Sequence, residues 1–136
     1  MNPRLTTVGV TVFAVLLLGA GAALTFLPEE IGAAVSGSST PPIVLAVLGA
    51  ALFGLGLLNW TARQAPIGGI YGRPVLLANL VHFTVGGLAL LRVALAEPVG
   101  VGFWGVTLVY LAGLVFYGVL LFRGPADPLS TGASHK

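Results

Sequence analysis

Residues 101–122 read VGFWGVTLVYLAGLVFYGVLLF, an apolar run that contains no charged side chain. A helix needs roughly 20 predominantly apolar residues to cross the hydrocarbon core of a bilayer, which is about 30 Å thick. This run is long enough to do so. The stretch therefore predicts one membrane-spanning helix, and the rest of the chain repeats its pattern.

Three further segments have the same character, at residues 6–27, 43–60 and 75–95, and Arg92 is the only charge inside any of the four. Backbone groups in hydrocarbon must hydrogen-bond within the protein, so spanning segments of this kind form helices. The first segment is longer than a signal-peptide core of about 7–15 residues, and we expect it to be retained. The sequence thus predicts an all-α integral membrane four-helix bundle, a single domain over residues 1–125 with a short flexible tail at 126–136.

Composition excludes several classes of protein. Of the 136 residues, 57% are hydrophobic and 7% are charged, whereas a soluble domain carries about a quarter charged residues. The chain has no cysteine, which excludes disulfides, thiolate metal sites and iron–sulfur clusters. Its six basic residues are scattered and form no patch for nucleic acid. We expect the lipid bilayer as solvent, and no cofactor and no metal.

The basic residues predict the orientation of the helices. Five of the six fall on one side of the predicted membrane: Arg4, Arg63, Arg73, Arg123 and Lys136. Lys and Arg concentrate on the cytoplasmic side of membrane proteins. We therefore expect both termini in the cytoplasm, in a multi-pass integral membrane protein.

Acidic residues mark the opposite side, where Glu29, Glu30 and Glu97 lie between predicted helices. Arg92 is close to the outer end of the third segment, and its long side chain can extend to the interface. We expect it to form an ion pair with Glu97, or with Glu29 and Glu30. The alternative is a binding site for a substrate anion.

Small residues predict how the helices pack, because helix association in lipid depends on close contact between them. The second segment has such a stripe at Ala46, Ala50 and Gly54, and the first has a shorter one at Gly19 and Ala23. The 20 glycines exceed what one bundle needs. A homo-oligomer or a larger membrane complex is therefore a second expectation.

A polar group of residues surrounds the second connection. Asn59 ends the second segment, and Asn79 and His82 share one face of the third, which Gly86 continues. Polar side chains are costly in hydrocarbon, so they indicate function by default. One interpretation is a cytoplasm-facing polar pocket between the second and third helices, lined by these three polar residues. The other is that they hydrogen-bond between helices and fix their register.

Three residues lie beside that predicted pocket: Arg63, Tyr71 and Arg73. They form either its mouth or a set of contacts with lipid headgroups. The loop at 68–73, GGIYGR, contains glycines that suit a phosphate, but it matches neither of the known phosphate-binding loops, which follow a strand. A tight turn near the headgroups explains the same residues.

The motifs LNWTAR at 58–63 and GGIYGRP at 68–74, followed by Asn79 and His82-Phe83, resemble a group of small four-helix bacterial membrane proteins without an assigned function. The close resemblance covers residues 54–87. It implies that this hairpin is a signature of the group, and it implies no activity.

The predicted spans lack the ionisable and catalytic side chains that several classes of membrane protein require. Small multidrug transporters carry a glutamate in their first helix, whereas residues 5–27 hold no ionisable group. No Ser/His/Asp set or carboxylate pair lies within the predicted spans. We therefore predict a non-enzymatic structural or accessory subunit, with no catalytic residue. The alternative is a protein that binds or transports a small or amphipathic molecule through the predicted polar pocket.

Overall fold

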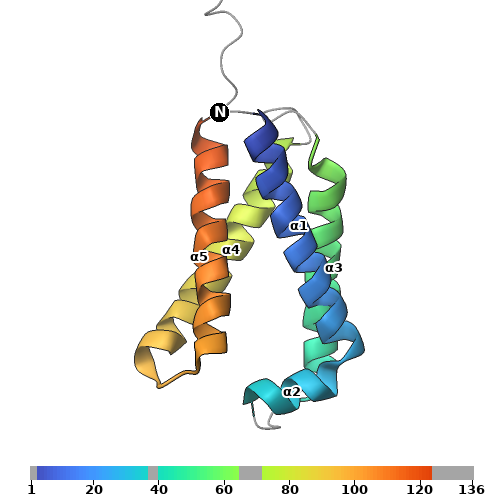
Figure 1. Ribbon diagram of the computed structural model, residues 1–136, viewed down its shortest axis with the longest axis vertical. Coiled ribbons are helices and arrows are strands. Elements are labelled where there is room, and N and C mark those ends of the chain that lie inside the picture. Colours follow the sequence, from blue (N-terminus) through green and yellow to red (C-terminus); the bar gives the residue numbers. More distant parts are fainter. Residues whose placement is uncertain (1–2, 37–39, 65–71, 124–136) are drawn as a thin grey trace, which may run out of the picture. The chain divides into compact units, whose positions relative to one another are not determined.

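The computed structural model describes residues 3–36, 40–64 and 72–123, and the secondary structure in these ranges is α-helical. The helices are α1 (Pro3–Phe26), α2 (Pro28–Ser36), α3 (Pro42–Ala62), α4 (Gly72–Ala96) and α5 (Val101–Arg123) (Figure 1). Four of them, α1, α3, α4 and α5, are long and apolar enough to cross a membrane. The predicted all-α class with four candidate spans is confirmed.

Prolines set where several helices begin. α1 and α3 begin at Pro3 and Pro42, and Pro74 lies in the first turn of α4 as predicted. Proline suits these positions because a first-turn N–H has no partner within the helix, and the ring fixes φ near the helical value. The observed bounds lie within about three residues of those predicted, and most helices extend slightly beyond them.

The short helix α2 is a feature that the sequence interpretation missed. The first predicted segment ends at residue 27, but a second helix begins at the next residue, Pro28. Pro28 has no N–H to donate to the carbonyl of Leu24, which breaks α1. Glu29 and Glu30 then occupy the first turn of α2, where carboxylates are favoured by the helix dipole. α2 turns across the ends of α1 and α3 and packs on both (Figure 1).

The chain divides into two compact units, Asn2–Gln64 and Ala65–Lys136. In the first, α1 packs against α3 as an antiparallel pair, with α2 at one end. In the second, α4 packs against α5. Each unit is a helical hairpin with its own seam, and the two are described separately below.

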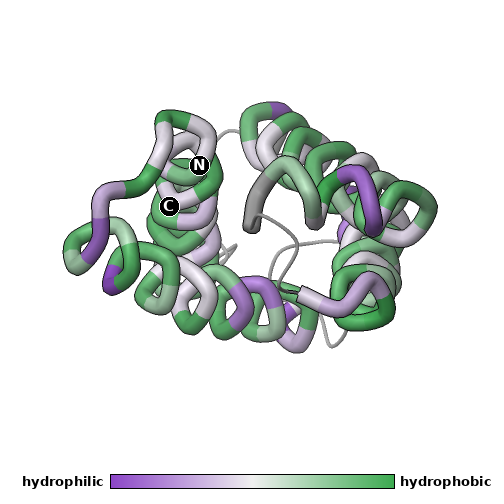
Figure 2. The backbone as a smooth tube through the Cα atoms, turned by 90° about the horizontal axis from the view of Figure 1, so that it is seen from below, coloured by the Kyte–Doolittle hydropathy of each residue, from purple (hydrophilic) through white to green (hydrophobic). Residues whose placement is uncertain are grey.

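The polarity of the helices is the reverse of that in a soluble protein. Large apolar side chains are exposed along them, and among the most exposed are Val101 at 90% and Phe122 at 84%. The buried residues include polar ones: Thr6, Asn59, Asn79 and Thr107. Hydropathy along the backbone is predominantly apolar, with only short hydrophilic stretches (Figure 2). Such surfaces suit a lipid solvent, and they indicate a multi-pass membrane protein.

Candidate functional site

The seam between α1 and α3 is built from glycines that bring two backbones into contact. A Cβ placed on Gly49 would lie 2.7 Å from the carbonyl oxygen of Gly21 and 2.7 Å from the backbone N of Thr25. A Cβ on Gly56 would lie 2.7 Å from the backbone N of Leu18. No side chain fits at these places. Glycine is therefore a packing requirement here, as in close helix pairs within membranes.

The small-residue stripes predicted from the sequence, as a seam within the chain or as an oligomer interface, do not form the α1–α3 seam. Ala50 and Gly54 lie on the exposed side of α3, and among the described residues a Cβ on Gly54 or Gly19 would meet no heavy atom within 4 Å. The buried positions of α3 are instead Gly49, Leu52, Gly56 and Asn59. Residues two positions apart in the sequence of an α-helix are separated by about 160° around its axis. Gly54 and Gly56 therefore point to nearly opposite sides.

The seam between α4 and α5 joins glycines to aromatic rings. The Tyr110 ring covers Gly86, since a Cβ on that glycine would lie 2.5 Å from Tyr110 Cε1. In the opposite sense, the Phe83 ring covers Gly113, where a Cβ would lie 2.5 Å from Phe83 Cδ1. Tyr117 is fully buried and stacks on Phe83, with ring centroids 5.5 Å apart. The rings of Tyr110 and Phe83 therefore each fill the space that a glycine leaves on the facing helix.

This aromatic cluster of Phe83, Tyr110 and Tyr117 was not predicted. Its signal in the sequence is the spacing of the two tyrosines, seven residues apart with Gly113 between them. Residues at this spacing lie on one side of a helix. The spacing of the two tyrosines shows that they share a face of the helix. It does not show which ring of the facing helix packs against Gly113.

The two asparagines of the predicted pocket are both completely buried. Asn59 Nδ2 donates a hydrogen bond to the carbonyl oxygen of Leu55 at 3.0 Å, and Asn79 Nδ2 donates to that of Val75 at 2.8 Å. Each amide thus bonds to the backbone one turn earlier in its own helix. Such bonds lower the cost of holding an amide in an apolar surrounding.

The predicted pocket draws on both units. Asn59 belongs to α3 of the first unit, and Asn79 and His82 belong to α4 of the second. Within α4, Asn79 is on the buried face and His82 is half-buried beside it. A pocket shared by all three residues stays a prediction.

His82 differs from the other polar residues of α4. Its ring contacts Phe83 edge-on, with centroids 5.1 Å apart, and Tyr110 of α5 at 5.3 Å. Its Nε2 atom is buried and has no hydrogen-bond partner within the described part of the chain. By contrast, Thr84 Oγ1 donates to the carbonyl oxygen of Leu80 at 2.6 Å. His82 therefore keeps unused hydrogen-bonding capacity beside an aromatic ring of the facing helix.

Arg63 lies immediately after α3 and folds back onto it. Its guanidinium carbon is 3.9 Å from the centroid of the Trp60 ring, and its Nη1 donates a hydrogen bond to the Trp60 carbonyl oxygen. Arg73 is exposed in the first turn of α4. Tyr71, the third residue predicted here, lies outside the described residues.

The predicted ion pair between Arg92 and Glu97 is not formed. Both residues are exposed, and in the described ranges neither takes part in an ion pair. The geometry of α4 explains this, because five residues along a helix separate two side chains by about 140°. α4 continues to Ala96, so the turn that would bring the two together does not occur before Glu97.

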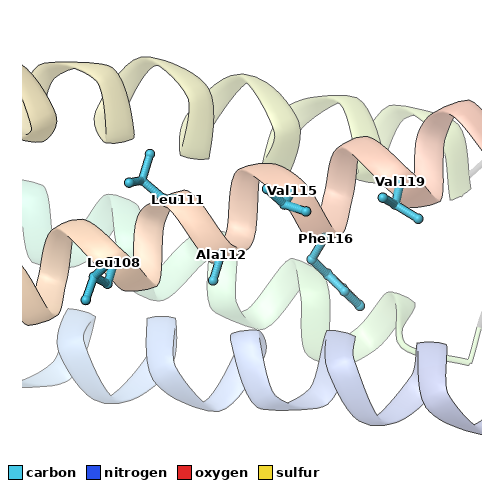
Figure 3. A pocket seen from close by; sticks show the side chains of 6 residues that line it. All are labelled: Leu108, Leu111, Ala112, Val115, Phe116 and Val119. Atoms are coloured by element: carbon cyan, nitrogen blue, oxygen red, sulfur yellow. The ribbon is translucent and has the colours of Figure 1, made fainter.

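A shallow, open hollow runs along one side of α5, lined by apolar side chains: Leu108, Leu111, Ala112, Val115, Phe116 and Val119 (Figure 3). Leu108, Ala112 and Phe116 project from the same side of the helix at intervals of four residues. The lining offers no polar group with which to orient a ligand.

Within residues 3–36, 40–64 and 72–123, no group of three or more His, Cys, Asp or Glu side chains is arranged to hold a metal ion. Comparison with protein-family models, with curated proteins and with solved structures finds no match. The resemblance to small four-helix membrane proteins stays a prediction. The function is therefore argued from the two seams and from the polar residues beside them.

Proposed function

We propose that this chain is a non-enzymatic structural or accessory subunit of a membrane, which associates with a second copy of itself or with a larger membrane complex. The observation that carries the proposal is the division of its glycines into two sets. One set lies in the seams of the two hairpins, as Gly49 and Gly113 do. The other set, which includes Gly54 and Gly105, lies on exposed helix faces.

The exposed set supports association because it leaves parts of α3 and α5 without side-chain bulk. Among the described residues, a Cβ on Gly54 or Gly105 would meet nothing within 4 Å. In lipid, a helix face of this kind is where another helix can approach closely. Each glycine in a helix also has a cost relative to alanine. Glycines that no internal contact requires therefore favour an external one.

Native mass spectrometry of gently solubilised protein tests this proposal. We expect a species of more than one chain, or one with a co-purifying partner. Gly54→Leu should convert it to single chains while the helical content stays the same, because Gly54 is outside the α1–α3 seam. Gly19→Leu makes the same change at an exposed glycine of α1, the helix that packs against α3. A strictly monomeric wild-type protein without a partner would contradict the proposal.

Both termini are proposed to lie in the cytoplasm, on the basis of the distribution of Arg and Lys. The absence of cysteine from the chain makes this easy to test, because any introduced cysteine is the only thiol.

The second candidate is a binding or transport protein for a small or amphipathic molecule. The specific observation in its favour is the buried Nε2 atom of His82, which has no hydrogen-bond partner in the described ranges. A bound molecule with a polar group would supply that partner. This candidate predicts that His82 lowers the stability of the protein, and the variant His82→Phe tests that prediction.

A further inference from the structure

The first unit separates its charges along the length of its helices. The seam pairs Gly21 with Gly49 and pairs Leu18 with Gly56, so α1 and α3 are antiparallel. The start of α1 and the end of α3 therefore share one end of the unit, which carries Arg4 and Arg63. We call it the arginine end.

The opposite end of the unit carries its acidic groups. Glu29 and Glu30 lie in α2, which packs across the other ends of α1 and α3, and residues 2–64 contain no further Asp or Glu. α3 has 21 residues, which at about 1.5 Å each make about 30 Å. The two carboxylates are thus too far from Arg63 to neutralise it.

Arg63 is also held in a defined position. The face of its guanidinium lies on the Trp60 indole at 3.9 Å, and one N–H donates to the Trp60 carbonyl oxygen. The other N–H groups of the guanidinium have no partner among the residues described. Arg63 is half-exposed and Trp60 is 39% exposed. An arginine fixed in this way presents its free N–H groups to the surroundings with little loss of side-chain freedom on binding.

The depth of this pair identifies the ligand chemistry. Tryptophan is enriched where the hydrocarbon meets the headgroups, and Arg63 is the residue that follows the last turn of a candidate span. Phosphate oxygens lie at that depth, and a guanidinium binds phosphate with two parallel hydrogen bonds. We propose that Arg63, held on Trp60, binds the phosphate group of an anionic phospholipid at the arginine end. This site is independent of the accessory role proposed above.

Native mass spectrometry of the full chain tests the site. The protein is released from nanodiscs that contain equal amounts of phosphatidylglycerol and phosphatidylcholine, and the retained lipids are counted. We expect wild type to retain phosphatidylglycerol preferentially. Arg63→Gln should reduce that retention about tenfold, the effect of losing charge-assisted hydrogen bonds. Arg92→Gln, an exposed arginine of α4, should retain as much as wild type.

Two further variants separate lipid binding from a purely structural role of Arg63. Arg63→Lys keeps the charge but loses the paired hydrogen bonds, and Trp60→Leu removes the surface on which the guanidinium lies. Both should give intermediate retention while circular dichroism shows unchanged helical content. Equal preference for phosphatidylglycerol in Arg63→Gln, Arg63→Lys and Arg92→Gln would overturn the proposal.

The source of the phosphate is tested by competition. Excess inorganic phosphate should leave the retained phosphatidylglycerol unchanged, because the acyl chains contribute to binding and free phosphate has none. Displacement of the lipid by inorganic phosphate would overturn the assignment to a phospholipid.

Discussion

Replacing Gly49 by alanine tests whether the contact of two backbones holds α1 and α3 together. The new Cβ would lie 2.7 Å from the carbonyl oxygen of Gly21 and from the backbone N of Thr25, and 2.6 Å from Thr25 Oγ1. Thr25 Oγ1 donates to the Gly21 carbonyl oxygen at 2.8 Å, so turning this hydroxyl away would break a hydrogen bond. The backbone atoms cannot turn away. The helices must therefore move apart by about 0.7 Å to restore an ordinary contact near 3.4 Å.

The size of the effect follows from that movement. A gap of about 0.5–1 Å forfeits a quarter to a half of the dispersion energy of each contact it opens, and overpacking costs about 1–3 kcal/mol in general. Alanine is favoured over glycine in a helix by about 1 kcal/mol in water. Within a single chain, Gly54→Ala on the same helix gains only that term, because its Cβ meets no described atom within 4 Å. We expect Gly49→Ala to be less stable than Gly54→Ala by about 1–3 kcal/mol.

Equilibrium unfolding in detergent micelles, followed by circular dichroism, measures both variants under the same conditions. Gly21→Ala should behave like Gly49→Ala, since its Cβ would lie 2.4 Å from the backbone N of Phe53. The double variant should cost less than the sum of the two, because the first substitution already separates the helices. Equal stability of Gly49→Ala and Gly54→Ala would refute the reasoning.

Three further predictions address the second unit and the orientation. Gly113→Ala should destabilise the protein by about 1–3 kcal/mol, because its Cβ would lie 2.5 Å from the Phe83 ring; equilibrium unfolding of this variant should show no such loss in the Phe83→Leu background. His82→Phe should raise the free energy of unfolding by about 1–3 kcal/mol, because it removes an unpaired buried polar atom. An unchanged or lower melting temperature would show that Nε2 has a partner. Gln64→Cys should be labelled by a membrane-impermeant maleimide only after cells are broken. Gly100→Cys should be labelled in intact cells. The reverse pattern would invert the proposed topology.

The sequence by itself determined the class of this protein, because crossing hydrocarbon is a property of single segments. Length, apolarity and the absence of charge are read along the chain without knowing its neighbours, and 101–122 is an example. Helix starts at Pro3 and Pro42 follow equally from local chemistry. The sequence prediction does not contain α2, although Pro28 is a local signal for it, because a proline that interrupts one helix can also begin the next.

Tertiary structure alone decided which residues form the seams. Glycines recur in each helix, so the sequence offers several stripes of equal quality, and the buried one on α3 contains Gly56 and not Gly54. The choice depends on the facing helix, since the Gly49 position is closed by Gly21 and the Gly113 position by the Phe83 ring. The same holds for Arg63 on Trp60. Composition specifies that helices can approach closely, but only the partner surface specifies on which face they do so.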